Sequence, residues 1–164
     1  MDIASFREHF TRIPRHVAVL AIKEEEEIYG VTISSLQSVS LDENEQILSF
    51  VLKKNSLFSE KLIKKGRLSV NFLGSAQAEI GKAYSSNDRH EATNHLGDVW
   101  RVYKDDLVYV NVAPLCVSGT LIDILKMQSS NIFFVSADEI LKTNKSEMLL
   151  YGNRVYGSFK AGEA

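Results

Sequence analysis

The sequence predicts a mainly β protein that forms a closed or nearly closed antiparallel β-barrel with helices at its rim. Three observations lead to this fold class. Segments rich in β-branched and aromatic residues outnumber helical segments, their connections are as short as hairpin turns, and one long strand is expected over residues 115–125. A doubly wound parallel sheet is the weaker alternative, because too few helical segments alternate with the strands.

Length and charge limit the classes of protein to which the chain could belong. A chain of 164 residues with 45% hydrophobic and 24% charged side chains can bury one core, so a single domain over residues 1–164 is expected. The net charge of −2 provides no positive field for nucleic acid or for a membrane surface, and neither partner is expected. Because no signal peptide or membrane span is recognisable, we expect a cytoplasmic protein.

The strands and helices are expected in a regular order through the first half of the chain. An amphipathic helix carrying Ile3, Phe6 and Phe10 is expected to begin after Asp2 and to cover the core. The acidic residues 24–27 form the turn of a hairpin rather than an interaction tail. Strands are expected at residues 17–22, 28–33, 47–52 and 67–73, with one helix opened by Asn55 or Ser56 and ended by Gly66, and a second from Ser75 to Ala83.

The second half contains one long loop and further strands. Residues 85–97 have little periodic apolar content, which indicates a surface loop of a length that is often functional. Strands follow at residues 99–103, 107–110, 115–125, 132–135 and 148–150. The single cysteine, Cys116, excludes an internal disulfide and is expected to pack in the core. His90 and His95 match no standard ligand spacing, so no metal site is expected.

Two polar segments could bind an anionic or heteroaromatic ligand. Residues 30–41, Gly-Val-Thr-Ile-Ser-Ser-Leu-Gln-Ser-Val-Ser-Leu, place many hydroxyl groups at a strand end and in the following loop. Residues 53–56, Lys-Lys-Asn-Ser, place two cations at the start of a helix, where backbone N–H groups favour a phosphate. Taken singly, the first segment is better interpreted as an ordinary polar strand end, and the second as an ordinary helix cap with solvated lysines.

Together and in this order, the two segments resemble the flavin reductase-like family, the FMN-binding split barrels. Members of that family carry a Gly-x-Thr-x-Ser-Ser-x-x-Ser-Val-Ser-Leu stretch, then an apolar strand and a helix opened by serine. The similarity continues through residues 68–73, Leu-Ser-Val-Asn-Phe-Leu, through Pro114 and Leu115, and through Tyr151 and residues 156–159, Tyr-Gly-Ser-Phe.

The resemblance implies a split antiparallel β-barrel that forms a homodimer, with flavin bound near the subunit interface. It implies an NAD(P)H-dependent flavin reductase that uses FMN or FAD, takes electrons from NADH or NADPH, and supplies reduced flavin to a partner such as a monooxygenase. By position, the flavin ring and ribityl chain would lie against one set of residues, and the phosphate against another. The first set is Thr32, Ile33, Ser34, Ser35 and Ser40; the second is Lys54, Asn55 and Ser56.

Three segments depart from the family pattern. Residues 42–45, Asp-Glu-Asn-Glu, replace an Asp-Pro-Pro, and Arg89-His90 replaces an Arg-Phe. Residues 128–130, Gln-Ser-Ser, replace the Gly-Asp-His whose histidine lies near the nicotinamide in reductases of the family. No catalytic residue is therefore assigned, and His16 is a candidate neighbour of the ring. The alternatives are a flavin-binding electron carrier or sensor without nicotinamide-dependent activity, and a dimeric interaction module without flavin.

Overall fold

A seven-stranded antiparallel sheet forms the body of the protein. The structure is a computed structural model that describes residues 2–85, 96–104 and 106–159. The strand order in the sheet is β3-β2-β6-β9-β10-β5-β4. The strands are β2 (Ala18–Glu24), β3 (Glu27–Ile33), β4 (Gln37–Asp42), β5 (Glu45–Lys53), β6 (Arg67–Phe72), β9 (Leu115–Lys126) and β10 (Ser130–Thr143).

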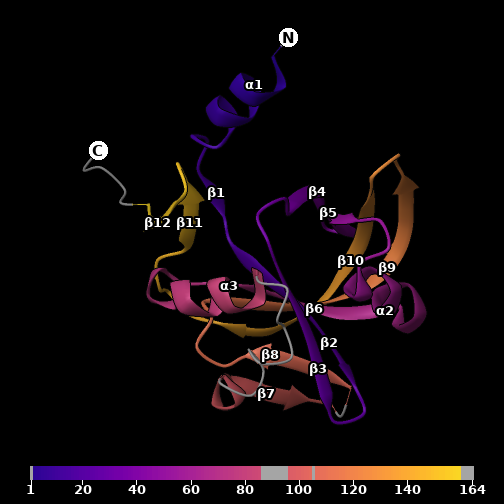
Figure 1. The fold of residues 1–164 in the computed structure, drawn as a ribbon. Helices are drawn as coiled ribbons and strands as arrows, with labels where there is room; N and C mark the ends of the chain where they lie inside the picture. The colour runs from indigo at the N-terminus through magenta and orange to yellow at the C-terminus, as the bar shows by residue number, and fades with distance from the viewer. Residues whose placement is uncertain (1, 86–95, 105, 160–164) are drawn as a thin grey trace.

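Two smaller sheets and three helices surround this sheet (Figure 1). One small sheet has the order β1-β11-β12 and the other pairs β7 with β8. Their strands are β1 (Arg15–His16), β11 (Leu149–Gly152), β12 (Val155–Ser158), β7 (Trp100–Tyr103) and β8 (Leu107–Val110). The helices are α1 (Ile3–Phe10), α2 (Leu57–Lys65) and α3 (Ala78–Ser85), with 3-10 turns at Ser75–Gln77 and Gly97–Val99. None of these helices is long and apolar enough to cross a membrane in the part of the chain that the structure describes.

The large sheet curves without closing. Among the described residues, β3 and β4 are its two edge strands and do not pair with each other. The barrel is therefore split, as the resemblance implies, and the mainly β antiparallel prediction is confirmed. Among the described strands, β3 pairs only with β2, so it forms one edge of the sheet.

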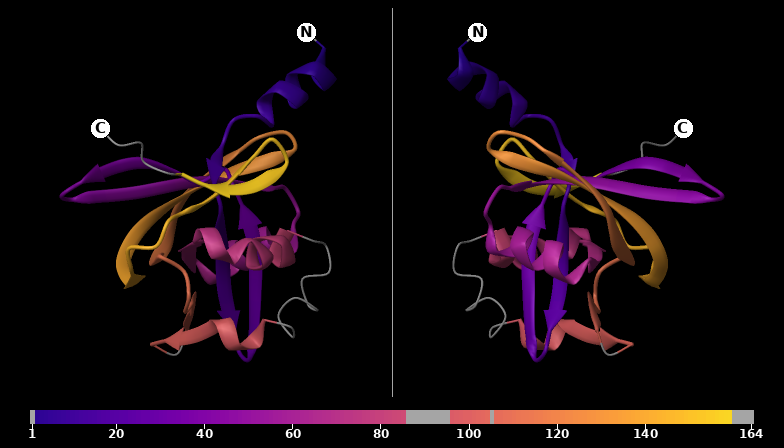
Figure 2. Two further views of the ribbon diagram at one scale, coloured as in Figure 1. Left: turned by 90° about the vertical axis from the view of Figure 1, so that its left-hand side faces the viewer. Right: turned by 90° about the vertical axis from the view of Figure 1, so that its right-hand side faces the viewer.

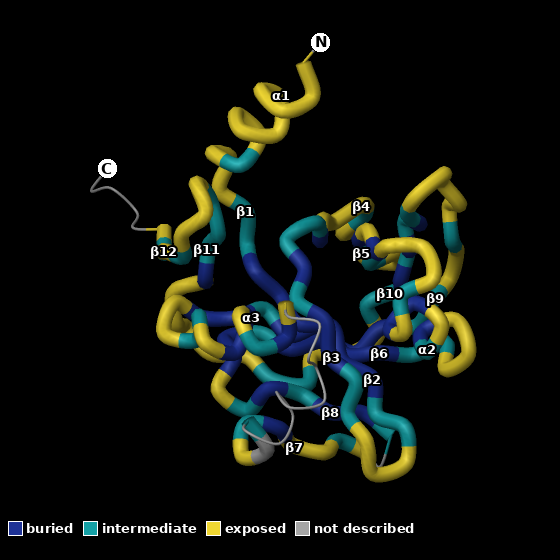
Figure 3. The backbone as a smooth tube through the Cα atoms, viewed as in Figure 1, coloured by how far each residue is buried: buried dark blue, intermediate teal, exposed yellow. Residues whose placement is uncertain are grey.

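Buried side chains form two clusters on the two faces of the sheet. The first lies inside the curve of the sheet, where Phe50 and Phe133 stack with ring centroids 5.6 Å apart. The second lies against α3 and the β7-β8 pair and includes Tyr84, Trp100 and the predicted core residue Cys116. In Figure 3 most of the buried residues, in dark blue, lie at the centre of the molecule. Burial raises the pKa of the Cys116 thiol to about 12, so this cysteine is a packing residue and not a thiolate.

Helix α1 does not cover the core, and this prediction was wrong. Asp2 caps the helix as expected, accepting hydrogen bonds from the N–H groups of Ala4 and Ser5, but no residue of the helix is buried. Figures 1 and 2 show α1 projecting away from the sheets. The apolar stripe of the helix was interpreted correctly, but a stripe alone does not identify the surface that it faces.

Strands β1, β4 and β12 were not predicted, and β10 is longer than expected. The acidic turn confirms the expected hairpin, since β2 ends at Glu24 and β3 begins at Glu27. Strand β12 was missed because its four residues show no apolar alternation. Strand β4 does alternate, with Val39 and Leu41 between polar residues, but its hydroxyl-rich sequence was interpreted as the loop that follows a strand. Strand β10 continues to Thr143, well past the expected residue 135, through a stretch interrupted by register shifts.

The motif asparagine Asn71 connects three strands inside the protein. Its side-chain amide Nδ2 donates to the carbonyl oxygen of Val19 at 3.0 Å and to Ser69 Oγ at 3.1 Å. Its Oδ1 accepts from the N–H of Val110 at 2.8 Å. Asn71 is fully buried, so it satisfies backbone groups of β2 and β8 that water cannot reach. The Val70-Asn71 pair of the motif therefore holds the fold rather than a ligand.

Replacing Asn71 by alanine is expected to lower the free energy of unfolding by about 2–4 kcal/mol, because two buried backbone groups lose their partners. Urea denaturation measures the change. The matched control is Ser118→Ala on β9, where the buried hydroxyl makes only a 3.5 Å contact to the Glu139 carbonyl. Ser118→Ala should lower the free energy of unfolding by less than about 1 kcal/mol. Equal losses in the two variants would contradict the role assigned to Asn71.

Candidate functional site

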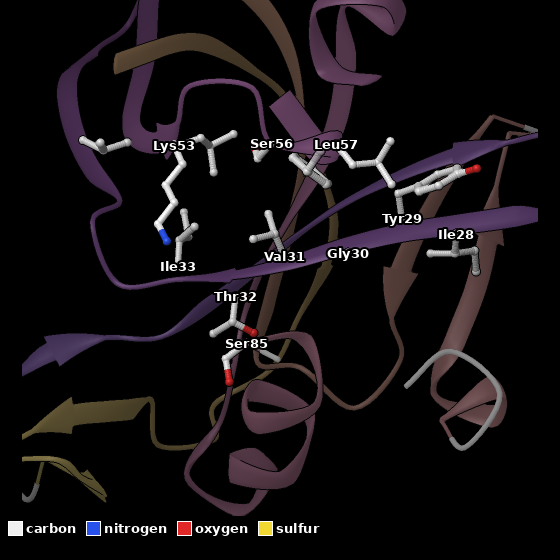
Figure 4. A pocket seen from close by; sticks show the side chains of 13 residues that line it. Ile28, Tyr29, Gly30, Val31, Thr32, Ile33, Lys53, Ser56, Leu57 and Ser85 are labelled. Carbon is white, nitrogen blue, oxygen red and sulfur yellow. The ribbon is translucent and has the colours of Figure 1, made fainter. Parts of the chain in front are cut away.

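An open cleft of about 520 Å³ lies between the edge strand β3, the end of β5 and the start of α2. Figure 4 shows β3 on one side of it, with Ser56 and Leu57 on the other. Its volume lies within the roughly 300–1,000 Å³ of ordinary ligand pockets. The lining residues are mostly apolar or hydroxylated: Ile28, Tyr29, Gly30, Val31, Thr32, Ile33, Val51, Leu52, Lys53, Ser56, Leu57, Phe58 and Ser85.

Strand β3 is held in place on one face by helix α3. Alternate residues of a strand point to opposite faces, so Gly30 and Thr32 face α3 while Val31 and Ile33 join the core inside the sheet. Thr32 Oγ1 donates a hydrogen bond to the Gly81 carbonyl at 2.7 Å. At Gly30 an added Cβ would lie 2.6 Å from Tyr84 Cε1, so only glycine allows this ring to pack against the strand.

Tyr84 is in turn fixed by Trp100. The Tyr84 hydroxyl accepts a hydrogen bond from Trp100 Nε1 at 2.7 Å, and the two rings meet edge to face with centroids 5.7 Å apart. Both residues are buried. The glycine and threonine of the hydroxyl-rich motif therefore position the strand, and the strand then forms the wall of the cleft.

The start of α2 supplies hydrogen-bond donors to the opposite side of the cleft. Ser56 is the N-cap, and its Oγ accepts from the N–H of Ser59 at 3.2 Å. The N–H groups of Leu57 and Phe58 lie in the first turn, where a helix provides no internal acceptor. Both residues line the cleft. The positive end of the helix dipole and these donors favour an anion at this point.

Lys53 carries the only side-chain charge on the lining of the cleft among the described residues. Tyr29 also lines it, but a hydrogen bond to the Glu27 carboxylate raises the pKa of the Tyr29 hydroxyl, so the phenol stays neutral. Figure 4 shows the Lys53 side chain extending toward Ile33 and away from Ser56. The cleft thus has a cation at one end of its apolar wall and helix N–H groups at another.

A second, smaller cavity of about 220 Å³ adjoins the cleft. The two share Thr32, Ile33 and Ser85 in their linings. The far side of the smaller cavity is formed by Tyr151 and Tyr156, whose ring centroids lie 5.0 Å apart. Burial is the main cause of the raised pKa of the Tyr156 hydroxyl. Two ligand groups bound in the two cavities would meet at β3.

The structure brings part of the predicted flavin set together. Thr32, Ile33 and Ser56 line the cleft, and Ser34 lines the smaller cavity with Thr32 and Ile33. Ser35 lies instead against β5, where its Oγ accepts from the N–H of Val51 at 3.1 Å. Ser40 lies on β4, and its Oγ donates to the Glu45 carbonyl at 3.1 Å.

Lys54 and Asn55 line neither of the two cavities. The Lys54 N–H donates to the Ser129 carbonyl at 3.2 Å, which ties this turn to the β9-β10 hairpin. Asn55 has a φ of 64°, a left-handed conformation that asparagine tolerates, and this turn brings Ser56 to the N-cap of α2. The sequence could not distinguish Lys53 from Lys54, because which lysine faces the cleft depends on where β5 ends.

The other residues singled out in the sequence lie away from the cleft. His16 packs against Phe72 with ring centroids 5.7 Å apart and lines neither cavity. Burial lowers the pKa of its imidazole. The described residues hold no group of three or more His, Cys, Asp or Glu side chains that could bind a metal ion. The predictions for Arg89, His90 and His95 fall outside the described residues.

A flavin fits the groups that line the cleft. An isoalloxazine ring needs an apolar slot with a few polar partners, which the apolar and hydroxylated side chains along β3 provide. A flavin phosphate needs donors, which Ser56 and the first turn of α2 provide.

Comparison with known proteins agrees with this fit. The flavin reductase like domain family matches residues 10–160. Over 86 residues the chain is 31% identical to the NADH-dependent flavin reductase StyB of Pseudomonas fluorescens. That alignment covers 52% of this chain and 49% of the relative, so it spans about half the length of the curated protein that it matches.

Solved structures share the whole fold. A putative flavin reductase from Haemophilus somnus superposes with a TM-score of 0.86 at 20% identity, covering 97% of this chain and 100% of that one. BorF, the flavin reductase component of a bacterial two-component tryptophan halogenase, superposes with a TM-score of 0.85 at 16% identity, covering 98% of this chain and 100% of BorF. An NADH:FAD oxidoreductase from Streptomyces globisporus, in complex with NAD and FAD fragments, superposes with a TM-score of 0.84 at 17% identity. The superposition covers 97% of this chain and 93% of the oxidoreductase.

The chain belongs to the flavin reductase like domain family, because the family match spans nearly all of its residues. The resemblance that the motifs indicated is confirmed, and the neighbouring structures confirm the split-barrel fold.

The packing of Tyr84 against Gly30 gives a direct test of how the cleft wall is held. Replacing Gly30 by alanine should lower the free energy of unfolding by about 1–3 kcal/mol, because the new methyl group displaces a buried ring. Gly157→Ala on β12 is the matched control, since an added Cβ there meets no heavy atom within 4 Å. Chemical denaturation of both variants measures the difference, and an equal, small effect in both would show that the Gly30 contact is unimportant.

Proposed function

We propose that this protein is an NAD(P)H-dependent flavin reductase that binds FMN or FAD in the cleft between β3 and α2. The observation that carries the proposal is the meeting, in one cleft, of an apolar strand edge and the donor-rich start of a helix. Family membership supports it, as does the NADH dependence stated for the Pseudomonas fluorescens relative. When bound, the flavin ring supplies the redox chemistry by accepting a hydride at its N5 atom.

The residues of this chain bind and orient the two ligands. Val31, Ile33 and Leu57 would contact the flat faces and edge of the ring and exclude water from it. Ser56 and the N–H groups of Leu57 and Phe58 would hold the phosphate. The nicotinamide would approach from the adjoining cavity beside Tyr151, where the two cavities share β3.

We further propose that two copies of the chain form a homodimer and that a monooxygenase-type partner receives the reduced flavin. Helix α1 supports the first point, because Ile3, Phe6 and Phe10 are largely exposed on one apolar stripe. The second point is supported by BorF, described as the reductase component of a two-component halogenase. A cytoplasmic location stays a prediction.

The second candidate function is a flavin-binding electron carrier or sensor without nicotinamide-dependent activity. It is favoured by the β9-β10 turn, where Gln128, Ser129 and Ser130 offer no ionisable side chain. Hydride transfer itself needs close approach of the two rings more than an acid or a base, so we prefer the reductase.

One experiment distinguishes the two candidates. The purified protein should bind added FMN or FAD and consume NADH or NADPH steadily only when flavin is present. Absorbance at the nicotinamide band and at the flavin band follows both reactions under anaerobic conditions. Flavin binding without nicotinamide oxidation would identify the carrier or sensor, and the absence of flavin binding would refute both functions.

A further inference from the structure

We propose that Lys53 pairs with the negative charge that the flavin ring gains on reduction, so that this cleft binds reduced flavin more tightly than oxidised flavin. The inference rests on the proposed function, because it requires flavin in the cleft. It goes beyond that function by assigning one residue to the discrimination between the two redox states of the ligand.

The charged side chains that line the cleft single out Lys53. Lys53 is the only ionised side chain on its described lining, and no carboxylate lines it. None of the ion pairs between described residues involves Lys53. The Lys53 side chain is exposed at the rim of the apolar wall, where its ammonium can pair with an anionic ligand. The cleft therefore favours a ligand with a negative charge near this point.

The position of the ammonium separates it from the proposed phosphate site. Lys53 is the last residue of β5, and its side chain extends toward Ile33 rather than toward Ser56 (Figure 4). The first turn of α2, with its N-cap Ser56, supplies the phosphate donors on the other side. The cleft thus offers two separate positive positions, whereas an oxidised flavin mononucleotide has one anionic group, its phosphate.

Reduction supplies the second anionic group. A hydride from the nicotinamide C4 carries one proton and two electrons to flavin N5, and the nicotinamide leaves as a cation. The neutral ring then holds one extra negative charge, on the edge formed by N1 and the C2 carbonyl. No other proton moves, so Lys53 acts only as the countercharge to the charge that develops. The proposal rests on this match: the cleft has two positive positions, and reduced FMN has two anionic groups.

The neighbouring lysine provides a matched control. Lys54 has the same side chain and is also exposed, but it lines neither cavity, and its backbone N–H is bonded to Ser129. Both lysines lie on the surface outside the buried clusters, so replacing either one by methionine keeps the apolar stem and removes only the charge.

The test compares dissociation constants of the wild type, Lys53→Met and Lys54→Met under anaerobic conditions. Each protein is titrated with FMN and with riboflavin, both oxidised and reduced with dithionite, at mildly alkaline pH. Lys53→Met should weaken binding of both reduced flavins by about tenfold and change binding of the oxidised forms by less than about twofold, the scale of one charge-assisted contact. Lys54→Met should leave all four constants within about twofold.

Other outcomes refute specific parts of the proposal. Equal weakening of oxidised and reduced FMN, with riboflavin unaffected, would assign Lys53 to the phosphate and overturn the inference while leaving the proposed function intact. Equal effects of the two methionine variants would mean that only the net charge matters, and would also overturn it. Failure of the wild type to bind any of the four ligands would refute the proposed function itself.

Discussion

The close packing of Tyr84 against Gly30 is the contact on which the rest of the site depends. A glycine in an edge strand lets an aromatic ring of α3 lie directly on the backbone, and the Thr32 hydroxyl bonds the same strand to the Gly81 carbonyl. These contacts use one face of β3. The other face joins the core of the sheet, and the strand forms one wall of the cleft.

The sequence predicted the β-rich architecture well because most strands of the sheet are short runs rich in β-branched and aromatic residues. Strand β6, for example, was expected from the pattern around Val70 and lies within one residue of its predicted bounds. The exposed strands β4 and β12 were not predicted, since strand pairing rather than burial defines them. Helix α1 was predicted, but its lack of contact with the core depends on tertiary structure and not on its own residues.

The motifs predicted the location of the site better than the role of each side chain. Thr32 borders the cleft, but its hydroxyl donates a hydrogen bond to the Gly81 carbonyl of α3. The Ser35 hydroxyl accepts a hydrogen bond from the N–H of Val51 on β5. A hydroxyl in a motif can serve the backbone as readily as a ligand, and sequence alone does not separate the two uses. The sequence assigned the flavin phosphate to Lys54, whereas Lys53 is the lysine that lines the cleft. The two residues have the same side chain, and only the position of the strand end decides which one faces the cleft.

The central claim is that flavin lies between β3 and the first turn of α2. Amide chemical shifts of the isotope-labelled protein, recorded as FMN is added, test this most directly because they report each residue separately. The largest changes should fall on Leu57, Phe58 and residues 31–33, with little change in the β7-β8 pair. Changes concentrated on β7-β8 or on α1, with the amides of Leu57 and Phe58 unmoved, would contradict the assignment.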